Sequence, residues 1–466
     1  MRTIILYPSP GMGHLISMVE LGKLILKHHP SFSIIVLTLI PSFNTGTTAS
    51  YIRRISSTFP TITFHHLPDI PLDPLLYPSM EAIIFDLIRR STPNVKTALH
   101  SISLSSPHLS AFIIDFFCTS GISVATTFHI PVYYFFTSGA SCLAQFLHLP
   151  TLHGKTTTSF KDMNTLIHSP GLPPIPSSDL PNTILDRTSI EYSDVLDSAV
   201  HMTKSAGIIV NTFDSLEPKA IKAIGDGSCV SDMPTPPVYC IGPLVAAGGD
   251  VSHDQCLNWL DSQPSRSVVY LCFGSLGLFS SDQLREIGIG LEMSGHRFLW
   301  VVRCPPSDNK SDRFQPPPEP DLNDLLPEGF LDRTVDRGLV VKSWAPQVAV
   351  LNHESVGGFV THCGWNSVLE AVSAGVPMVA WPLYAEQKVN KVVLVEEMKL
   401  ALQMEESDGG KVTATEVEKR VRELMESSEE GKGVRQMVKM RKEEAATALS
   451  DGGSSRLALA KLVEFW

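Results

Sequence analysis

The sequence WAPQVAVLNHESVGGFVTHCGWNSVLEAVSAGVPMVAWPLYAEQ, residues 344–387, carries the strongest indication of the fold of this chain. It twice passes from a short β-rich run towards a helix. GGFVTHC turns at Gly364 into NSVLEAVSAG, and VPMVAWPL leads to Glu386 and Gln387. Strands that alternate with helices in this way indicate an open parallel sheet, in which ligands bind at the carboxyl ends of the strands. We therefore predict that this stretch forms a binding site.

The polar side chains of this stretch suit a nucleotide. Asn366 and Ser367 stand in the first turn of the expected helix, where N–H groups without helical partners and a partial positive charge favour a phosphate. Glu370 follows one turn later and can accept hydrogen bonds from a ribose diol, and Trp344 can stack on a flat base. An ordinary strand–helix–strand unit explains these residues singly as core or capping groups, but it does not explain the whole set.

The same alternation recurs along the rest of the chain. Runs that we predict to be strands are 4–7, 32–40, 111–115, 131–136, 207–211, 267–274, 297–302, 338–341, 358–361 and 376–381. Many are apolar without interruption, as expected of parallel strands that are covered on both faces. At 466 residues the chain is too long for one ordinary core, so we expect two domains, 1–240 and 241–452, followed by a terminal helix at 453–466.

Composition excludes several classes of protein. The net charge of −11 gives the chain no reason to bind nucleic acid or an anionic membrane surface. No run of about eighteen apolar residues is present, and the first apolar run is broken by Pro8 and Pro10, so we predict a cytoplasmic protein with neither signal peptide nor anchor. The eight cysteines form no CxxC pair and are predicted to be reduced thiols. The chain has no DxD motif and no metal-ligand spacing, so no metal is expected.

A second set of chemical groups lies near the amino terminus. The strand IILY runs into PSPGMG, and His14 follows Gly13 at the entry to the first helix. Asp115 ends the strand AFIID, which places its carboxylate at the same sheet edge. A carboxylate on one imidazole nitrogen fixes the tautomer of a histidine base and stabilises the imidazolium. From the residues alone, His14 can equally cap or pack, and Asp115 can cap the segment FFCTSGISVA.

Residues 344–387 resemble the nucleotide-sugar signature of plant family 1 UDP-glycosyltransferases, from WAPQ through HCGWNS and Glu370 to the closing Glu-Gln. The segments SPGMGHLISMVELGK, AFIIDFFCTS, YYFFTSGA and IIVNTFDSLEP look like the subgroup of dihydrochalcone, chalcone and flavonoid O-glucosyltransferases. The resemblance implies an α/β protein of GT-B architecture, with two Rossmann-like doubly wound parallel-sheet domains facing a cleft. It also implies that the helix at 453–466 returns to the N-terminal domain.

The two halves differ in charge. Residues 1–240 carry 14 Lys and Arg and 16 Asp and Glu, whereas residues 241–466 carry 23 and 32. We therefore expect the more apolar N-terminal domain to take a hydrophobic acceptor, and the resemblance implies that the C-terminal domain takes UDP-glucose.

The resemblance also implies a role for each matching residue. His14 is the catalytic base and Asp115 is its partner. The other matching residues are expected to bind the UDP-sugar. Those at the diphosphate are Ser275, His362, Asn366 and Ser367, those at the hexose are Trp365, Glu386 and Gln387, and those at uracil are Trp344, Ala345 and Gln347. Glu370 is expected at the ribose, Thr137 near the sugar, and Gly13 at a close approach of the backbone to the substrates.

The implied reaction is inverting, metal-independent transfer of glucose from UDP-glucose to a hydroxyl of a phenolic or flavonoid-type acceptor, by a monomer without a cofactor. Trp365 stands where related glucuronosyltransferases have an arginine, and Gln387 can bridge two equatorial hydroxyls of glucose with one donor and one acceptor. A C-glucosyltransferase is the closest alternative. A dinucleotide oxidoreductase would need GxGxxG where this chain has GMGHLI, and the presence of both His14 and Asp115 argues against a non-catalytic UDP-sugar sensor.

Overall fold

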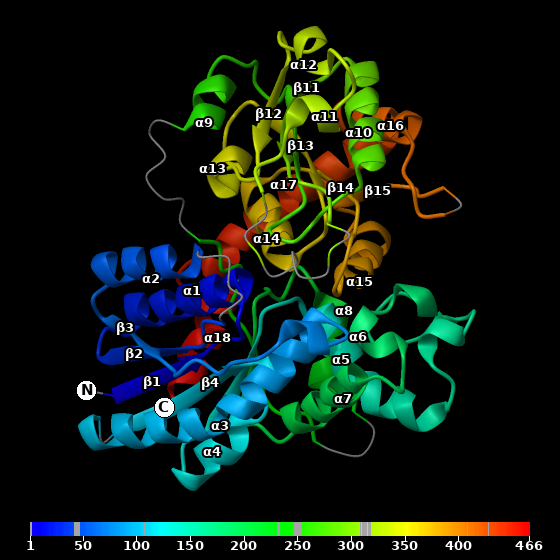
Figure 1. Ribbon diagram of the computed structural model, residues 1–466. Helices are drawn as coiled ribbons and strands as arrows, with labels where there is room; N and C mark the ends of the chain where they lie inside the picture. The colour runs from blue at the N-terminus through cyan, green and yellow to red at the C-terminus, as the bar shows by residue number, and fades with distance from the viewer. Residues whose placement is uncertain are drawn as a thin grey trace. The chain divides into compact units, whose positions relative to one another are not determined.

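The computed structural model describes residues 2–41, 47–106, 108–230, 234–246, 254–307, 309, 315, 318–407, 409–426 and 428–466 (Figure 1). The chain divides into two compact units. Unit 1 holds the described residues within Met1–Leu244 and Thr447–Trp466, and unit 2 holds those within Val245–Asn309 and Pro317–Ala446. The sequence prediction had placed the boundary after residue 240 and the start of the returning segment at residue 453.

The sheet of unit 1 is parallel throughout. Its described strands lie in the order β3-β2-β1-β4-β5-β8-β9. Their bounds are β1 Arg2–Tyr7, β2 Phe32–Thr38, β3 Ile62–His66, β4 Leu109–Asp115, β5 Val132–Phe136, β8 Gly207–Val210 and β9 Val238–Cys240. The helices are α1 Met12–His28, α2 Thr47–Thr58, α3 Met80–Ser105, α4 Gly121–Thr127, α5 Ala140–Lys155, α6 Asn182–Leu185, α7 Ile190–Met202, α8 Pro218–Gly225 and α18 Ser454–Val463, and a small hairpin joins β6 Leu166–Ile167 to β7 Ile175–Pro176.

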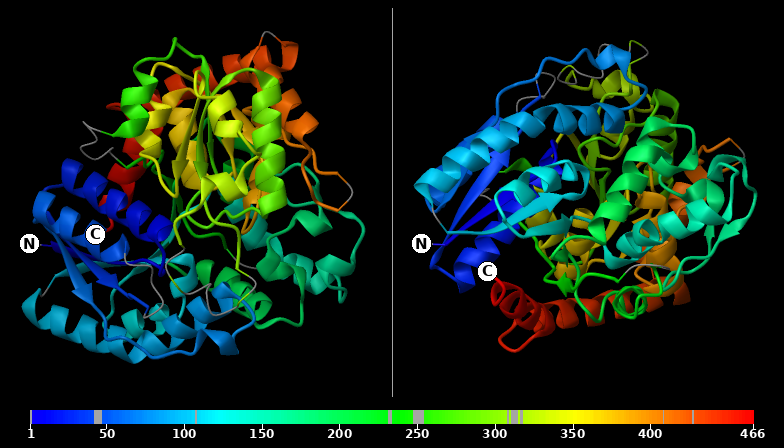
Figure 2. Two further views of the ribbon diagram at one scale, coloured as in Figure 1. Left: turned by 45° about the horizontal axis from the view of Figure 1, so that its top comes forward. Right: turned by 90° about the horizontal axis from the view of Figure 1, so that it is seen from below.

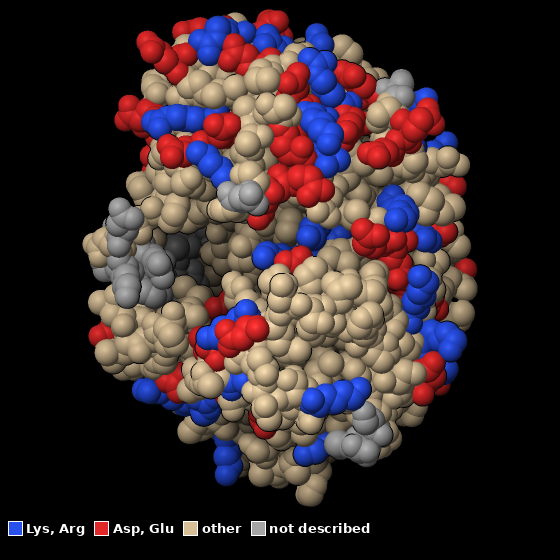
Figure 3. Space-filling view, turned by 90° about the vertical axis from the view of Figure 1, so that its right-hand side faces the viewer, with Lys and Arg blue, Asp and Glu red and all other residues tan. Residues whose placement is uncertain are grey.

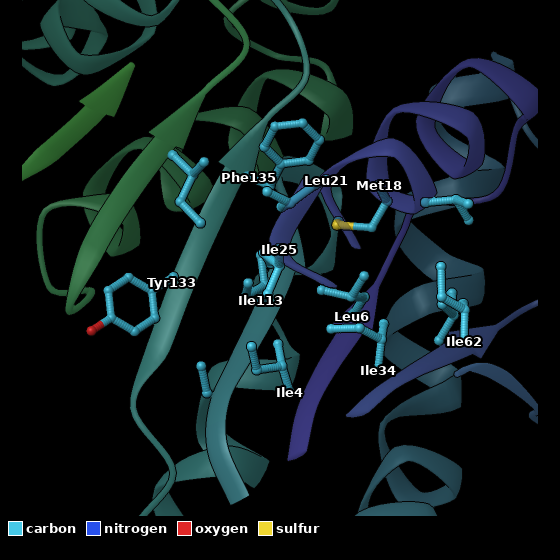
Figure 4. Close-up of a cluster of buried hydrophobic side chains, with 14 of the residues drawn as sticks. Ile4, Leu6, Met18, Leu21, Ile25, Ile34, Ile62, Ile113, Tyr133 and Phe135 are labelled. Atoms are coloured by element: carbon cyan, nitrogen blue, oxygen red, sulfur yellow. The ribbon is translucent and has the colours of Figure 1, made fainter. Parts of the chain in front are cut away.

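Helices cover both faces of this sheet. The apolar stripe of α1 and residues of α2 and α18 pack together on one face, and α3 and α4 lie on the other (Figure 1). Figure 4 shows Met18, Leu21 and Ile25 of α1 pointing towards side chains of the strands, including Leu6 and Ile113. All five side chains are fully buried, and so are Ile5 and Ile114, the neighbours that face the opposite side of the sheet. Burial on both faces explains why the strand sequences are apolar without alternation.

The C-terminal helix α18 belongs to unit 1. Ser455 donates a hydrogen bond to the carbonyl of Gly242 at 2.5 Å, and the guanidinium of Arg2 donates to the carbonyl of Trp466. The indole of Trp466 packs edge-on against Phe32, with ring centroids 6.1 Å apart. The last residues of the chain are therefore anchored on the first strands of the same unit.

The sheet of unit 2 is also parallel, and its described strands lie in the order β12-β11-β10-β13-β14-β15. Their bounds are β10 Val268–Cys272, β11 Arg297–Val302, β12 Gly338–Lys342, β13 Val356–Thr361, β14 Met378–Ala380 and β15 Ala401–Gln403. The helices are α9 Gln255–Leu260, α10 Ser281–Ser294, α11 Leu322–Leu325, α12 Phe330–Arg333, α13 Gln347–Leu351, α14 Trp365–Ala374, α15 Gln387–Val392 and α16 Ala414–Met425, and α17 Glu429–Leu449 leads towards unit 1. Residues of α10, α12 and α16 share one core with the sheet. The left view of Figure 2 shows helices on both sides of the green and yellow strands of this unit.

Each sheet has a point at which the strand order reverses. In unit 1 the chain builds outward from β1 to β3 and then resumes at β4 on the other side of β1. In unit 2 the same reversal separates β10 from β13. Loops diverge at such a point and leave room for a ligand at the carboxyl ends of the two strands. This topology indicates where each unit binds its ligand.

The surface and the thiols agree with the composition. Charged side chains are dense over the unit 2 part of the face in Figure 3, whereas the unit 1 part carries them more sparsely. All eight cysteines lie in the described part of the chain, and none forms a disulfide. Within the described residues, no helix is both long enough and apolar enough to cross a membrane.

Candidate active site

His14 and Asp115 meet at the reversal point of unit 1. His14 lies in the first turn of α1, directly after β1, and Asp115 is the last residue of β4. The Nδ1 atom of His14 is 2.8 Å from Oδ2 of Asp115. The aspartate side chain is fully buried, whereas the histidine side chain is 31% exposed. A buried carboxylate thus contacts one nitrogen of a histidine whose ring reaches the surface of the unit.

Asp115 performs two functions with its two oxygens. While Oδ2 faces His14, Oδ1 accepts a hydrogen bond of 3.3 Å from the backbone N–H of Phe117 and caps the short 3₁₀ helix Phe116–Cys118. The ring of Phe117 packs edge-on against the His14 imidazole, with centroids 5.6 Å apart. Pairing with His14 and helix capping, which the sequence left as alternatives for Asp115, therefore occur together.

Gly11, Thr137 and Glu217 shape the surroundings of His14. Gly11 precedes α1 with φ of 133°, a conformation that side chains rarely adopt, and this turn brings His14 to the sheet edge. Thr137 follows β5 and places its Oγ1 3.4 Å from Nδ1 of His14. Glu217 caps α5, the helix that follows Thr137, because its carboxylate accepts 2.8 Å hydrogen bonds from the N–H groups of Ala140 and Ser141 at the start of that helix. Burial raises the pKa of Glu217.

His362 lies at the reversal point of unit 2. It follows β13, and its side chain is enclosed so tightly that a Cβ atom added to Gly274 or Gly364 would come within 2.5 Å of its Nε2. His362 is 6% exposed, and burial lowers its pKa to about 4, so the ring is neutral at physiological pH. Its Nδ1 is buried and has no hydrogen-bond partner within the described structure. Such an atom is costly unless a ligand or a water satisfies it.

Gln347, Ser367 and Glu370 form one hydrogen-bonded group. The amide nitrogen of Gln347 donates to Oγ of Ser367 at 2.8 Å and to Oε2 of Glu370 at 2.6 Å. Burial raises the pKa of the Glu370 carboxyl to about 7, and the bond from Gln347 limits the rise. The resemblance predicted Gln347 beside uracil, Glu370 at the ribose and Ser367 at the diphosphate. The structure adds that Gln347 holds both of them in place.

The start of α14 combines a backbone N-terminus with a buried tryptophan. Trp365 and Asn366 occupy its first turn, and Gly364 provides no side-chain cap. Trp365 is only 4% exposed, so its indole is buried in the core, and its contact with the hexose stays a prediction. The preceding residue, Cys363, has φ of 65°, and its carbonyl accepts a 3.0 Å hydrogen bond from the Asn390 side chain.

Gln387 forms hydrogen bonds within its own turn. Its side-chain oxygen accepts hydrogen bonds from the N–H groups of Leu383 at 2.9 Å and Tyr384 at 3.0 Å, and the residue is 2% exposed. The oxygen that the sequence assigned to a hexose hydroxyl thus already accepts two hydrogen bonds within the turn, and the role of Gln387 at the hexose stays a prediction. Glu386 stands one residue earlier at the start of α15 and is half-buried.

Two further predicted residues are exposed. Trp344 follows β12 and is 66% exposed, which leaves a face of the indole open for stacking, whereas Ala345 is buried. Ser275 follows β10 and is exposed next to Gly274, the glycine that packs on His362. The predicted residues thus fall into two groups, with Gly13, His14, Asp115 and Thr137 in unit 1 and the remainder in unit 2.

Three residues that position these groups were not predicted from the sequence. Glu217 was present in the quoted segment IIVNTFDSLEP, but nothing in that segment distinguishes a buried cap from a surface acid. Tyr384 lies with its ring centroid 6.0 Å from that of His362, and burial raises the pKa of its phenol to about 12, although hydrogen bonds with Gln387 and the Leu276 backbone oppose the rise. Asn390, which supports Cys363, lies just beyond the segment used for the prediction.

Two Rossmann-like units with polar residues at both strand-order reversals define a nucleotide-dependent transferase of GT-B type. Residues 229–449 match the family described as UDP-glucoronosyl and UDP-glucosyl transferase. The chain is 52% identical to phloretin 2'-O-glucosyltransferase of Pyrus communis over 477 residues, covering 99% of this chain and 98% of that protein. It is 50% identical to anthocyanidin 5,3-O-glucosyltransferase of a Rosa hybrid cultivar, again covering 99% and 98%.

The solved structures agree with this assignment. UGT2 of Phytolacca americana, complexed with UDP-2fluoro-glucose and pterostilbene, superimposes with a TM-score of 0.87 at 38% sequence identity and covers 100% of both chains. The protein therefore belongs to the UDP-glycosyltransferase family, as the resemblance of residues 344–387 predicted, and its GT-B fold and transferase activity are confirmed.

Proposed function

We propose that this enzyme transfers glucose from UDP-glucose to a hydroxyl of a phenolic acceptor of the flavonoid type, with inversion and without a metal. The relatives named above act on phloretin and anthocyanidin, which are phenols of this type. The observation that carries the proposal is the 2.8 Å contact between His14 and Asp115 at the carboxyl edge of a parallel sheet.

The contact determines which nitrogen acts as the base. A carboxylate only accepts hydrogen bonds, so Nδ1 of His14 carries the proton and Nε2 carries the lone pair. Nε2 takes the proton of the acceptor hydroxyl while that oxygen attacks the anomeric carbon of glucose. The bond between the anomeric carbon and the diphosphate breaks on the opposite side, so the configuration inverts. Asp115 stabilises the imidazolium, and an oriented base of this kind contributes about 10²–10⁴-fold to the rate.

The leaving group departs as UDP, and unit 2 offers hydrogen-bond donors to it. The buried Nδ1 of His362, the first turn of α14 and the exposed Ser275 lie at the ends of adjacent strands. A helix N-terminus stabilises a diphosphate without a cation. Trp344 would stack on uracil, and Glu370 would accept hydrogen bonds from the ribose diol. We further propose that the enzyme acts as a monomer in the cytosol, where its eight unpaired cysteines would remain reduced.

The proposal is tested by incubation of the purified enzyme with UDP-glucose and a panel of flavonoid, chalcone and dihydrochalcone phenols. We expect a product that is heavier than the acceptor by one glucosyl residue and that acid hydrolyses to the acceptor and glucose. An acid-stable product would show transfer to carbon instead. No product with any phenol, while the enzyme still binds UDP, would reject the proposed acceptor class.

The role of the dyad has a matched control in the same helix. His14→Ala should abolish turnover and leave UDP binding within about threefold, because the base belongs to unit 1. His29→Ala, at the other end of α1, should keep wild-type turnover. Near-normal turnover by the His14 variant would show that another group removes the proton.

A further inference from the structure

Arg303 follows β11 directly, and its neighbours in the sheet lead to proposed donor-binding residues. In the strand order of unit 2, β11 lies between β12 and β10. The strand β12 leads to Trp344 and β10 leads to Ser275. Because all of these strands are parallel, their carboxyl ends lie at one edge of the sheet. Arg303 therefore stands between the proposed base-stacking residue and the turn proposed to meet the diphosphate.

The guanidinium of Arg303 has no anionic partner within the described part of the chain. Its Nε is buried without a hydrogen bond. The groups that act on it electrostatically are the thiols of Cys272 and Cys304 and the phenol of Tyr384, and no described carboxylate is among them. Burial lowers the pKa of Arg303, which remains a cation. A partly desolvated cation without a counter-ion is unfavourable, and an anionic ligand would relieve this cost.

Contacts connect Arg303 to His362. Arg303 lines a small cavity together with Gly274 and Gly277, on either side of the turn that carries Ser275. Gly274 packs directly on the ring of His362, whose Nδ1 also lacks a partner within the described structure. Tyr384 interacts with both groups, since its ring centroid lies 6.0 Å from that of His362 and its phenol interacts electrostatically with the guanidinium of Arg303.

We propose that Arg303 provides a positive charge to the diphosphate of the sugar-nucleotide donor, in addition to the neutral donors of His362, Ser275 and α14. This inference rests on the proposed function and names a further binding residue for the same site. A guanidinium can donate two parallel hydrogen bonds to phosphate oxygens, which a neutral helix end cannot do. Arg303 would then hold the diphosphate in the ground state and stabilise the charge that UDP gains as it leaves.

The test compares two ligands that differ only in the diphosphate. Calorimetric titration measures the Kd of UDP and of uridine for wild type, Arg303→Gln, Arg303→Lys and the control Arg297→Gln, which removes an equal charge from the opposite end of β11. Arg303→Gln should weaken UDP binding by about 10- to 100-fold and change uridine binding by less than about twofold. Arg303→Lys should lose less, and Arg297→Gln should match wild type for both ligands.

Two results would overturn the inference. An equal loss of UDP and uridine affinity in Arg303→Gln would assign Arg303 to the folding of the turn, and unchanged affinity for both would remove it from the site. If Arg303→Gln does not fold, Arg303→Met decides, because methionine keeps an unbranched apolar side chain but carries no charge, and an unaltered ratio of UDP to uridine affinity in that variant would then refute the inference. Failure of the wild-type protein to bind UDP would instead reject the proposed function itself.

Discussion

Donor affinity should depend on pH through Glu370. Burial raises the pKa of this carboxyl to about 7, from an ordinary value of 4.5. Only the ionised form can accept two hydrogen bonds from a ribose diol, and those bonds favour ionisation in the complex. Binding of UDP-glucose therefore releases a proton near and below pH 7. Its affinity should fall as the pH drops through 7 and should level off above pH 8.

The size of this effect follows from the two pKa values. If the pKa of Glu370 in the complex returns to its ordinary value, the Kd of UDP-glucose rises by about tenfold between pH 8 and pH 6. UDP-glucose itself carries no group that titrates in this range. His362, with a pKa of about 4, remains neutral throughout.

Calorimetry in the absence of acceptor gives both the Kd and the number of protons released, when buffers of different ionisation enthalpy are compared. Glu370→Gln keeps a partner for Gln347 but cannot ionise, so its Kd should be weaker at pH 8 and almost constant from pH 6 to pH 8. A flat profile in the wild-type enzyme, or a slope that persists in Glu370→Gln, would refute the assignment of Glu370 to the ribose.

Three further outcomes are expected. Asp115→Ala should reduce kcat less than His14→Ala does, because it removes the orientation of the base rather than the base itself, and steady-state kinetics of both variants would reveal the order. Turnover should persist in excess EDTA, and a loss that magnesium or manganese restores would contradict transfer without a metal. UDP-glucose should be preferred over UDP-glucuronate and UDP-galactose by at least about tenfold in kcat/KM, since an unpaired buried polar group costs about 1–3 kcal/mol. Gln387→His should reduce the preference over UDP-galactose and also lower the Tm, because the bonds to Leu383 and Tyr384 are lost.

The central strands were predictable because burial on both faces leaves an uninterrupted apolar sequence. The run RFLWVV at 297–302 coincides with β11, and the run AFIID at 111–115 falls within β4. The short strands β3, β9 and β15 were not predicted. Each lies at an edge of its sheet, where one side lacks a neighbouring strand, and β3 ends in the polar pair His65 and His66. Their pairing depends on the sheet that they join rather than on their own sequence.

The location of a site residue was predictable where the residue directly follows a strand of the parallel sheet. His14 and Asp115 each stand at the carboxyl end of a strand, so the topology alone brings them to one edge. The use of Gln387 within its own turn and the bridging amide of Gln347 were not predictable, because they depend on which of several side-chain conformations the folded loops select. A role assigned to a residue by family resemblance does not say which side-chain conformation the residue adopts in the folded loop.

The two oxygens of Asp115 have a consequence for the divergence of such proteins. Asparagine at this position would still cap the 3₁₀ turn through its oxygen, but its amide would present N–H groups to His14 and favour the tautomer with the proton on the wrong nitrogen. Alanine would lose both interactions. A descendant that kept the scaffold but abandoned chemistry should therefore retain a capping residue here and lose the acid, so this one position can separate active members from inactive ones when sequences are compared.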